Sequence, residues 1–256
     1  MSILTIQMLA ALFIWLISVS GGFAAIYMYK QLAHDHPALQ LAEAFAGGIF
    51  LGAAFFHMLP DAQIALQSAI PSPNYPFANL VCAAGFCLLL FLEQIVQFYS
   101  NAEKKYSINL VPLLLTLLIS IHAIIEGVAL GVNQQIASIL IIFVAIAVHK
   151  SSEGFAVGLQ LTRGTMSLKT IIILFGLFSL MSPLGVTIGA LAREALHGRS
   201  QELVTGIFNA FAAGTFLYIA TLHKLHHEHH HHNIQLYEFC ATLLGLSIMA
   251  GVAVWL

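Results

Sequence analysis

Eight long apolar stretches constrain this chain more than any other feature of its sequence. They lie at 3–29, 38–60, 77–99, 108–132, 136–161, 168–191, 203–222 and 234–256. Each has about the 20 residues that a helix needs to cross the hydrocarbon core of a bilayer. Inside lipid the backbone must satisfy its own N–H and C=O groups, which favours helices. We therefore predict an all-α polytopic membrane protein with eight transmembrane helices.

The amino-acid composition supports this fold class and indicates which binding partners to expect. The 256 residues are 59% hydrophobic and only 8% charged, whereas soluble proteins are about 25% charged. We read 1–256 as a single integral-membrane domain in a lipid bilayer. The sequence has no basic patch or zinc-finger spacing, which argues against nucleic acid as a partner. Its 13 histidines outnumber the nine Lys and Arg residues, which points toward transition metals.

The loop charges predict the orientation. If both termini lie outside, the inside connections hold six basic residues and the outside ones two, as the positive-inside rule requires. The inside set is Lys30, Lys104, Lys105, Arg163, Lys169 and Lys224, and the outside set is Arg193 and Arg199. This orientation makes 223–233 a His-rich cytoplasmic loop.

The loop contains a tract of six histidines, and their imidazoles at high local density are expected to bind metal weakly. A cytosolic metal acceptor or sensor and a plain solvated loop both stay open as its role. The tract comprises His226, His227, His229, His230, His231 and His232.

A short internal repeat occupies two of the apolar stretches. The pattern H-x-x-x-E-G-x-A-x-G occurs at 122–131 and again at 149–158. On a helix, residues four apart stand on one face, about 6 Å apart along the axis. His122 and Glu126, and likewise His149 and Glu153, can therefore share one metal ion.

The two repeats lie near the middle of consecutive spans, so antiparallel packing places His122 and His149 at similar depth. Two imidazoles and two carboxylates suit Zn²⁺ and also accept Fe²⁺, Mn²⁺ or Cd²⁺. A lone transmembrane histidine is often only an interhelical hydrogen-bonding group. Because the His/Glu pair is duplicated, we favour a metal site, and we expect no organic cofactor.

Further polar residues lie along the spans. His57 and Asp61, one turn apart near the outer end of the second span, can steer ions inward, or serve as a packed histidine and a helix-end cap. His223, at the inner end of the seventh span, is a candidate exit ligand. Glu43 is expected to reach the membrane interface.

Four motifs resemble the ZIP (Zrt-, Irt-like protein) family of divalent-metal transporters. They are the two repeats, GIFLGAAFFHMLPDA at 48–62 and AAGTFLY at 212–218, and the likeness covers all eight spans. The resemblance implies transport of Zn²⁺ or a related ion into the cytoplasm by an elevator-like movement of a transport domain against a scaffold.

The resemblance also implies how many ions are held. Family members often bind a second metal with an Asn or Asp after the fourth-helix His, an acidic residue after the fifth-helix ligand and a Glu before the sixth-helix Pro. Ala123, Lys150 and Ser182 stand at these positions. An ammonium at Lys150 neutralises Glu126 or Glu153, so we expect a single-metal site. His-Lys and Ser-Pro in these helices mark one branch of the family.

Other function classes stay open at this point. A membrane metallo-enzyme or a metal sensor would use the same His/Glu cluster, and an exporter is the nearest alternative within transport. We favour a transporter over an enzyme because no His-Glu-x-x-His or other hydrolase signature is present. Insertion in a plasma membrane or a bacterial inner membrane, and assembly as a homodimer, fit this interpretation.

Overall fold

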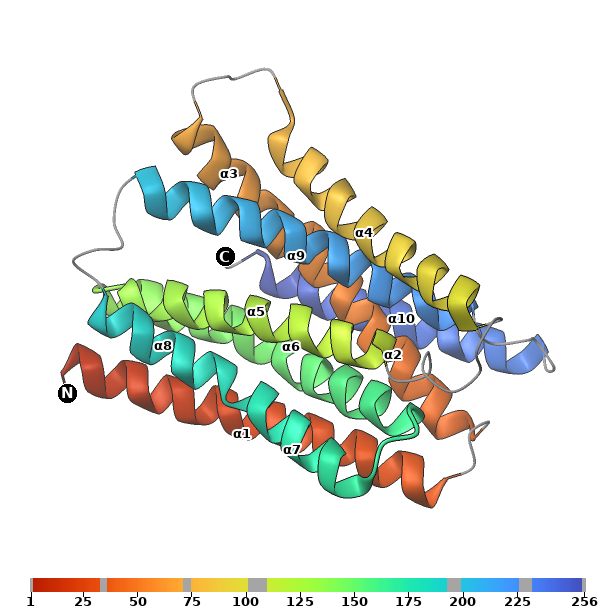
Figure 1. Cartoon of the computed structure of the whole chain (residues 1–256). Helices are drawn as coiled ribbons and strands as arrows, with labels where there is room; N and C mark the ends of the chain where they lie inside the picture. The colour runs from red at the N-terminus through yellow and green to blue at the C-terminus, as the bar shows by residue number, and fades with distance from the viewer. Residues whose placement is uncertain are drawn as a thin grey trace.

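The computed structural model describes residues 2–32, 36–70, 75–100, 110–192, 199–225 and 232–254. In these ranges the chain forms a bundle of helices with no strand (Figure 1). The elements are α1 (Ile3–Gln31), α2 (Pro37–Ala53), the π-helix η1 (Ala54–Met58), α3 (Leu59–Ala69), α4 (Phe77–Ser100), α5 (Leu110–Val132), α6 (Ile136–Arg163), α7 (Leu168–Ser179), α8 (Met181–Leu191), α9 (Arg199–Leu225) and α10 (His232–Val252).

The predicted fold class is confirmed. Eight helical stretches within the described ranges are long and apolar enough to cross a membrane. One crossing consists of α2, η1 and α3 in continuous sequence, and another of α7 and α8. The two ends of the chain lie toward the same end of the bundle (Figure 1), as an even number of crossings requires.

The second crossing is longer than predicted. We placed its end at residue 60, but the helix continues to Ala69. In a regular α-helix Pro60 would clash with the carbonyl four residues back. The wider π-turn η1 precedes it, and there the N–H of Leu59 donates to the carbonyl of Ala54, five residues back. The helix can therefore pass the proline instead of stopping.

The sixth span is broken near its middle. One helix ends at Ser179 and the next begins at Met181. Pro183 has no N–H to offer the carbonyl of Ser179, four residues earlier, and its ring crowds that carbonyl. The break therefore falls one turn before the proline.

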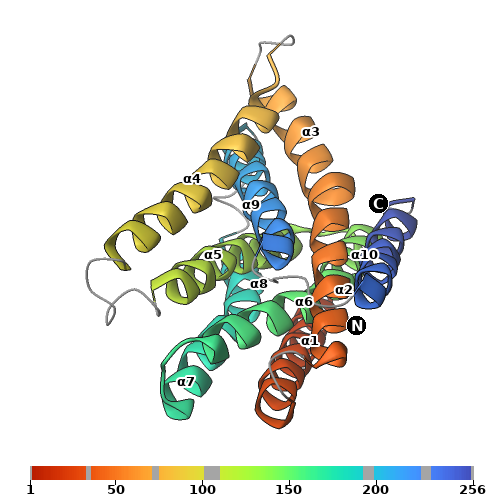
Figure 2. The same ribbon diagram turned by 90° about the vertical axis from the view of Figure 1, so that its right-hand side faces the viewer.

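The helices pack as two groups. The α5–α6 group comprises α1, α5, α6, α7 and α8, and the α2–α9 group comprises α2, η1, α3, α4, α9 and α10. The most extensive seams, α1 with α6, α5 with α8, α2 with α10 and α4 with α9, all lie within a group. In Figure 2 the helices α1, α6 and α7 lie at the bottom and α3, α4 and α9 at the top.

Glycines of the repeat form the seams of the α5–α6 group. A Cβ at Gly154 would overlap the carbonyl of Ser18 in α1, and a Cβ at Gly127 would overlap the carbonyl of Ser182 in α8. The last glycine of each repeat makes the same kind of close contact. Small residues let helix backbones approach in a bilayer, where apolar burial gives little net attraction. Each repeat thus packs its helix against a different neighbour.

The glycine seams predict a position-specific loss of stability. Gly185→Ala in α8 puts a methyl against the carbonyl of Ile124, whereas Gly176→Ala in α7 meets nothing within 4 Å. Overpacking of this kind costs about 1–3 kcal/mol, so Gly185→Ala should lower the Tm of the detergent-solubilised protein. Gly176→Ala should leave the Tm unchanged or raise it, because alanine is the better helix former. Equal Tm values for the two variants would contradict this packing account.

Candidate metal site

Four polar side chains meet where α5 and α6 face each other. His122 and Glu126 come from α5, and His149 and Glu153 from α6. One nitrogen or oxygen from each lies within 4.8 Å of all the others. The helices are consecutive and joined by three residues, so they run antiparallel and bring the two repeats to the same depth. The spatial grouping expected from the sequence is present.

The distances suit a small cation. Glu126 Oε1 lies 3.0 Å from His122 Nε2 and 2.7 Å from His149 Nε2. Glu153 Oε1 lies 3.6 Å and 3.5 Å from the same two nitrogens. Tetrahedral Zn²⁺ with bonds of about 2.0–2.2 Å separates its ligand atoms by about 3.3–3.6 Å. The two contacts of Glu126 Oε1 are shorter than this and must lengthen by a few tenths of an ångström to admit the ion.

The four side chains are poorly satisfied by one another. Among the described residues, both ring nitrogens of His122, Nδ1 of His149, Oε2 of Glu126 and Oε1 of Glu153 are buried without a hydrogen-bond partner. His149 and Glu153 are fully buried, and His122 and Glu126 are 4% and 6% exposed. Each unpaired buried polar atom costs about 1–3 kcal/mol. A cation among the four side chains would give Nε2 of His122 and Oε1 of Glu153 the partner that they lack.

Lys150 brings a positive charge into the site. Its Nζ lies 2.5 Å from Glu153 Oε2 and 3.7 Å from Glu126 Oε2. The ammonium also lies 5.7 Å from the ring centroid of Phe178, and the side chain is only 1% exposed. Each carboxylate thus turns one oxygen to the histidines and the other to the lysine. The ion pair that the sequence favoured for Lys150 is present.

Ser182 lies in α8, beside the α5 repeat. Its carbonyl packs on Gly127, the residue after Glu126, and its side chain is 1% exposed. Its Oγ has no hydrogen-bond partner among the described residues. A serine hydroxyl carries no charge, so this position supplies no carboxylate for a second ion.

His57 and Asp61 approach the cluster from the α2–α9 group. The rings of His57 and His149 have centroids 6.0 Å apart. His57 Nδ1 lies 3.1 Å from Asp61 Oδ2, and the side chains are 15% and 46% exposed. His57 belongs to the π-helix η1, whose extra residue per turn changes the direction of the side chains that follow. Exposure falls stepwise from Asp61 through His57 to the buried cluster.

Phe216 of α9 was not identified from the sequence as a site residue. Its ring centroid lies 5.1 Å from that of His122 and 6.2 Å from that of His149. It also packs edge-on against Phe50 of α2, with centroids 4.7 Å apart. The residue lies within the segment 212–218, but an aromatic in an apolar span carries no local sign of a site. It closes the cluster on the side of the α2–α9 group.

Part of the predicted pathway lies outside the described residues. This applies to His226, His227, His229, His230 and His231, and to the side chains of His223 and His232, which stand at the adjoining ends of α9 and α10.

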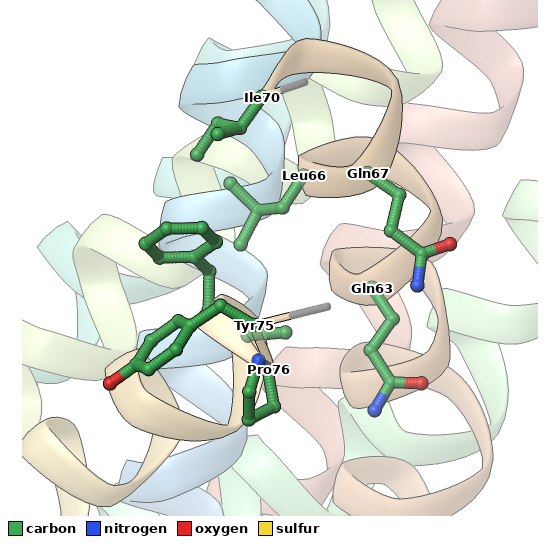
Figure 3. Close-up of a pocket in the computed structure, with 8 residues that line it drawn as sticks. Gln63, Leu66, Gln67, Ile70, Tyr75 and Pro76 are labelled. Atoms are coloured by element: carbon green, nitrogen blue, oxygen red, sulfur yellow. The ribbon is translucent and has the colours of Figure 1, made fainter. Parts of the chain in front are cut away.

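A small cavity lies at the α3–α4 end of the bundle (Figure 3). It contains no His, Cys, Asp or Glu, and it is lined mainly by Gln63, Leu66, Gln67, Ile70, Tyr75 and Pro76.

Comparison with known proteins shows the family of the chain. The family described as "ZIP Zinc transporter" matches residues 2–109 and 99–253. The chain is 30% identical to "Zinc transporter ZIP1" of Takifugu rubripes over 84% of each chain. It is 26% identical to "Zinc transporter ZIP2" of Mus musculus over 93% of this chain and 94% of the relative. It is also 26% identical to "Zinc transporter ZIP2" of Homo sapiens over 87% of each. With eight membrane-spanning helices and a buried His/Glu cluster, the chain is an integral membrane protein of the ZIP zinc transporter family.

Proposed function

We propose that this protein carries Zn²⁺ into the cytoplasm, one ion at a time, on His122, Glu126, His149 and Glu153. The observation that carries the proposal is the convergence of these four buried side chains, each of which has at least one nitrogen or oxygen atom without a hydrogen-bond partner among the described residues. Relatives named zinc transporters cover most of the chain. Fe²⁺, Mn²⁺ and Cd²⁺ accept the same ligands, and the cycle needs no organic cofactor.

The proposed route of the ion begins at Asp61. This carboxylate is the most exposed of the polar groups near the cluster, and His57 lies between it and His149. A partly hydrated cation can exchange water for these ligands one at a time, which avoids a bare ion in an apolar span. On the far side we place His223 and the tract from His226 to His232 as the receiving groups.

A single ion fits the charge of the site. The ammonium of Lys150 lies within ion-pair distance of both Glu126 and Glu153, where it can take the place of a second metal. The two carboxylates and the ammonium of Lys150 together carry a net charge of minus one before the metal enters. Removing one member of a buried ion pair is strongly destabilising, so Lys150 also lets the unloaded site persist inside the membrane.

An elevator-like movement is supported by the way the helices pack. Backbones interlock through glycines at α1–α6 and α5–α8, both within the α5–α6 group. The two groups meet through side chains instead, such as the rings of Phe216 against His122 and His149. Sliding along such a surface changes rotamers but breaks no close backbone contact. The α5–α6 group would therefore carry the ion against the α2–α9 group.

Sidedness and assembly complete the proposal. Placing both termini outside follows from the loop charges, and it puts the Arg163 end of α6 at the cytoplasm. The surrounding bilayer is then a plasma membrane or a bacterial inner membrane, and the chain functions there on its own or as a homodimer.

Transport is tested by uptake of radiolabelled Zn²⁺ into cells that express the protein. Glu153→Ala at matched surface expression should abolish the saturable uptake, because the variant removes a ligand and leaves Lys150 without its nearest partner. Lys169→Gln, an exposed charge on α7, serves as the control and should keep it. Uptake unchanged in Glu153→Ala would refute the site, and no uptake by the parent protein would refute transport.

Binding is tested separately by equilibrium dialysis with Zn²⁺. The six tract histidines are first replaced by serine, so that only the intramembrane site is titrated. His149→Ala should weaken binding by about 100-fold or more, because it removes a ligand from a site of only four. His36→Asn is the matched control, since His36 is an exposed helix cap and lies outside the cluster. Equal affinities for the two variants would contradict the assignment.

A further inference from the structure

An ion pair joins the two helix groups far from the metal cluster. Arg163, the last residue of α6, places Nη2 2.5 Å from Oε1 of Glu43 in α2. The Glu43 side chain is only 7% exposed and that of Arg163 is 36% exposed. From the sequence we expected Glu43 to reach the membrane interface. Its carboxylate is instead held inside the bundle by a residue 120 positions away.

The pair lies in register with the metal site along one antiparallel seam. His57 of η1, which continues α2, faces His149 of α6 at one level, and Glu43 of α2 faces Arg163 at another. Fourteen residues separate the two positions on each helix. At 1.5 Å per residue, this places the ion pair about 21 Å from the level of His57 and His149.

Apolar side chains fill the seam between these two levels. Ala46 and Phe50 of α2 and Ala156 and Leu159 of α6 are buried in one cluster. Phe216 of α9 belongs to the same cluster and also borders the metal site. An ion leaving toward the Arg163 end of α6 must therefore pass an apolar layer and then the ion pair.

The two ends of the seam differ in exposure. At one end the Asp61 side chain is 46% exposed, whereas at the other the Glu43 carboxylate is buried beneath Arg163. We propose that the Glu43–Arg163 ion pair is a latch that holds the pathway shut at the Arg163 end of α6 and must break before the ion leaves there. This inference rests on the proposed function, because it assigns the exit to that end.

The surroundings of the pair suit a latch that opens and closes. The half-exposed Arg163 can return to water when the pair breaks, so opening leaves no buried cation behind. The pair links α2 to α6, which belong to different groups. A contact made in only one of two states shifts the balance between them by its own free energy. Weakening the pair should therefore raise the population open at this end.

The latch is tested by the accessibility of one cysteine in zinc-free medium. The reporter is Ala46→Cys, one turn from Glu43, in a protein with Cys82→Ala, Cys87→Ser and Cys240→Ser. Membrane vesicles that present the Arg163 end are treated with a membrane-impermeant maleimide, and the alkylation rate is measured. The variants are Glu43→Gln, Arg163→Gln and the exchanged pair Glu43→Lys with Arg163→Glu. The control is Lys169→Gln, an exposed charge near the same end.

The single variants should be alkylated about fivefold faster or more, and the exchanged pair should return to the slow rate of the parent and of Lys169→Gln. Unchanged rates in both single variants would overturn the latch. Fast alkylation that the exchanged pair does not restore would also overturn it, because the effect would then come from local disruption. The readout needs no ion flux, so a failure of zinc transport and a failure of the latch are distinguishable.

Discussion

Two carboxylates and an ammonium inside an apolar bundle are the constraint on which the rest of this structure depends. A charge in the hydrocarbon region costs several kcal/mol unless it faces the protein interior and is paired. Glu126, Glu153 and Lys150 meet both conditions, because they lie between α5 and α6 and contact one another. The helices α1 and α8 cover this pair of helices closely, since glycines replace side chains along both seams.

Much of the site could be predicted because the residues that form it are close together in the sequence and occur in a repeated pattern. The His/Glu spacing fixes one helical face, the repeat places His122 and His149 at one depth, and Lys150 is adjacent to His149 in sequence. The contacts of Phe216 and the pair of Glu43 with Arg163 could not be predicted, since each joins helices that are far apart in the chain. The extension of the second crossing to Ala69 was missed because Pro60 normally ends a helix, and a π-turn leaves no local signature.

The division of the helices into two groups also divides the residues of the site. All four side chains of the cluster belong to the α5–α6 group, while His57, Asp61, Phe216 and Glu43 approach from the α2–α9 group. The exposed carboxylate lies at one end of the seam and the buried ion pair at the other. The structure therefore presents the cluster toward the Asp61 end, with apolar residues between it and the Arg163 end. A relative movement of the two groups would close the cluster toward the Asp61 end and open it toward the Arg163 end.

X-ray absorption at the zinc edge, together with the metal-to-protein ratio, tests the central claim most directly. The sample is the protein in which serine replaces the six tract histidines, loaded with Zn²⁺ and freed of excess. The account predicts one zinc per chain, bound by two imidazole nitrogens at about 2.0–2.1 Å and by carboxylate oxygens at about 2.0–2.2 Å. Two ions per chain, a sulfur ligand or a first shell without imidazole would contradict it.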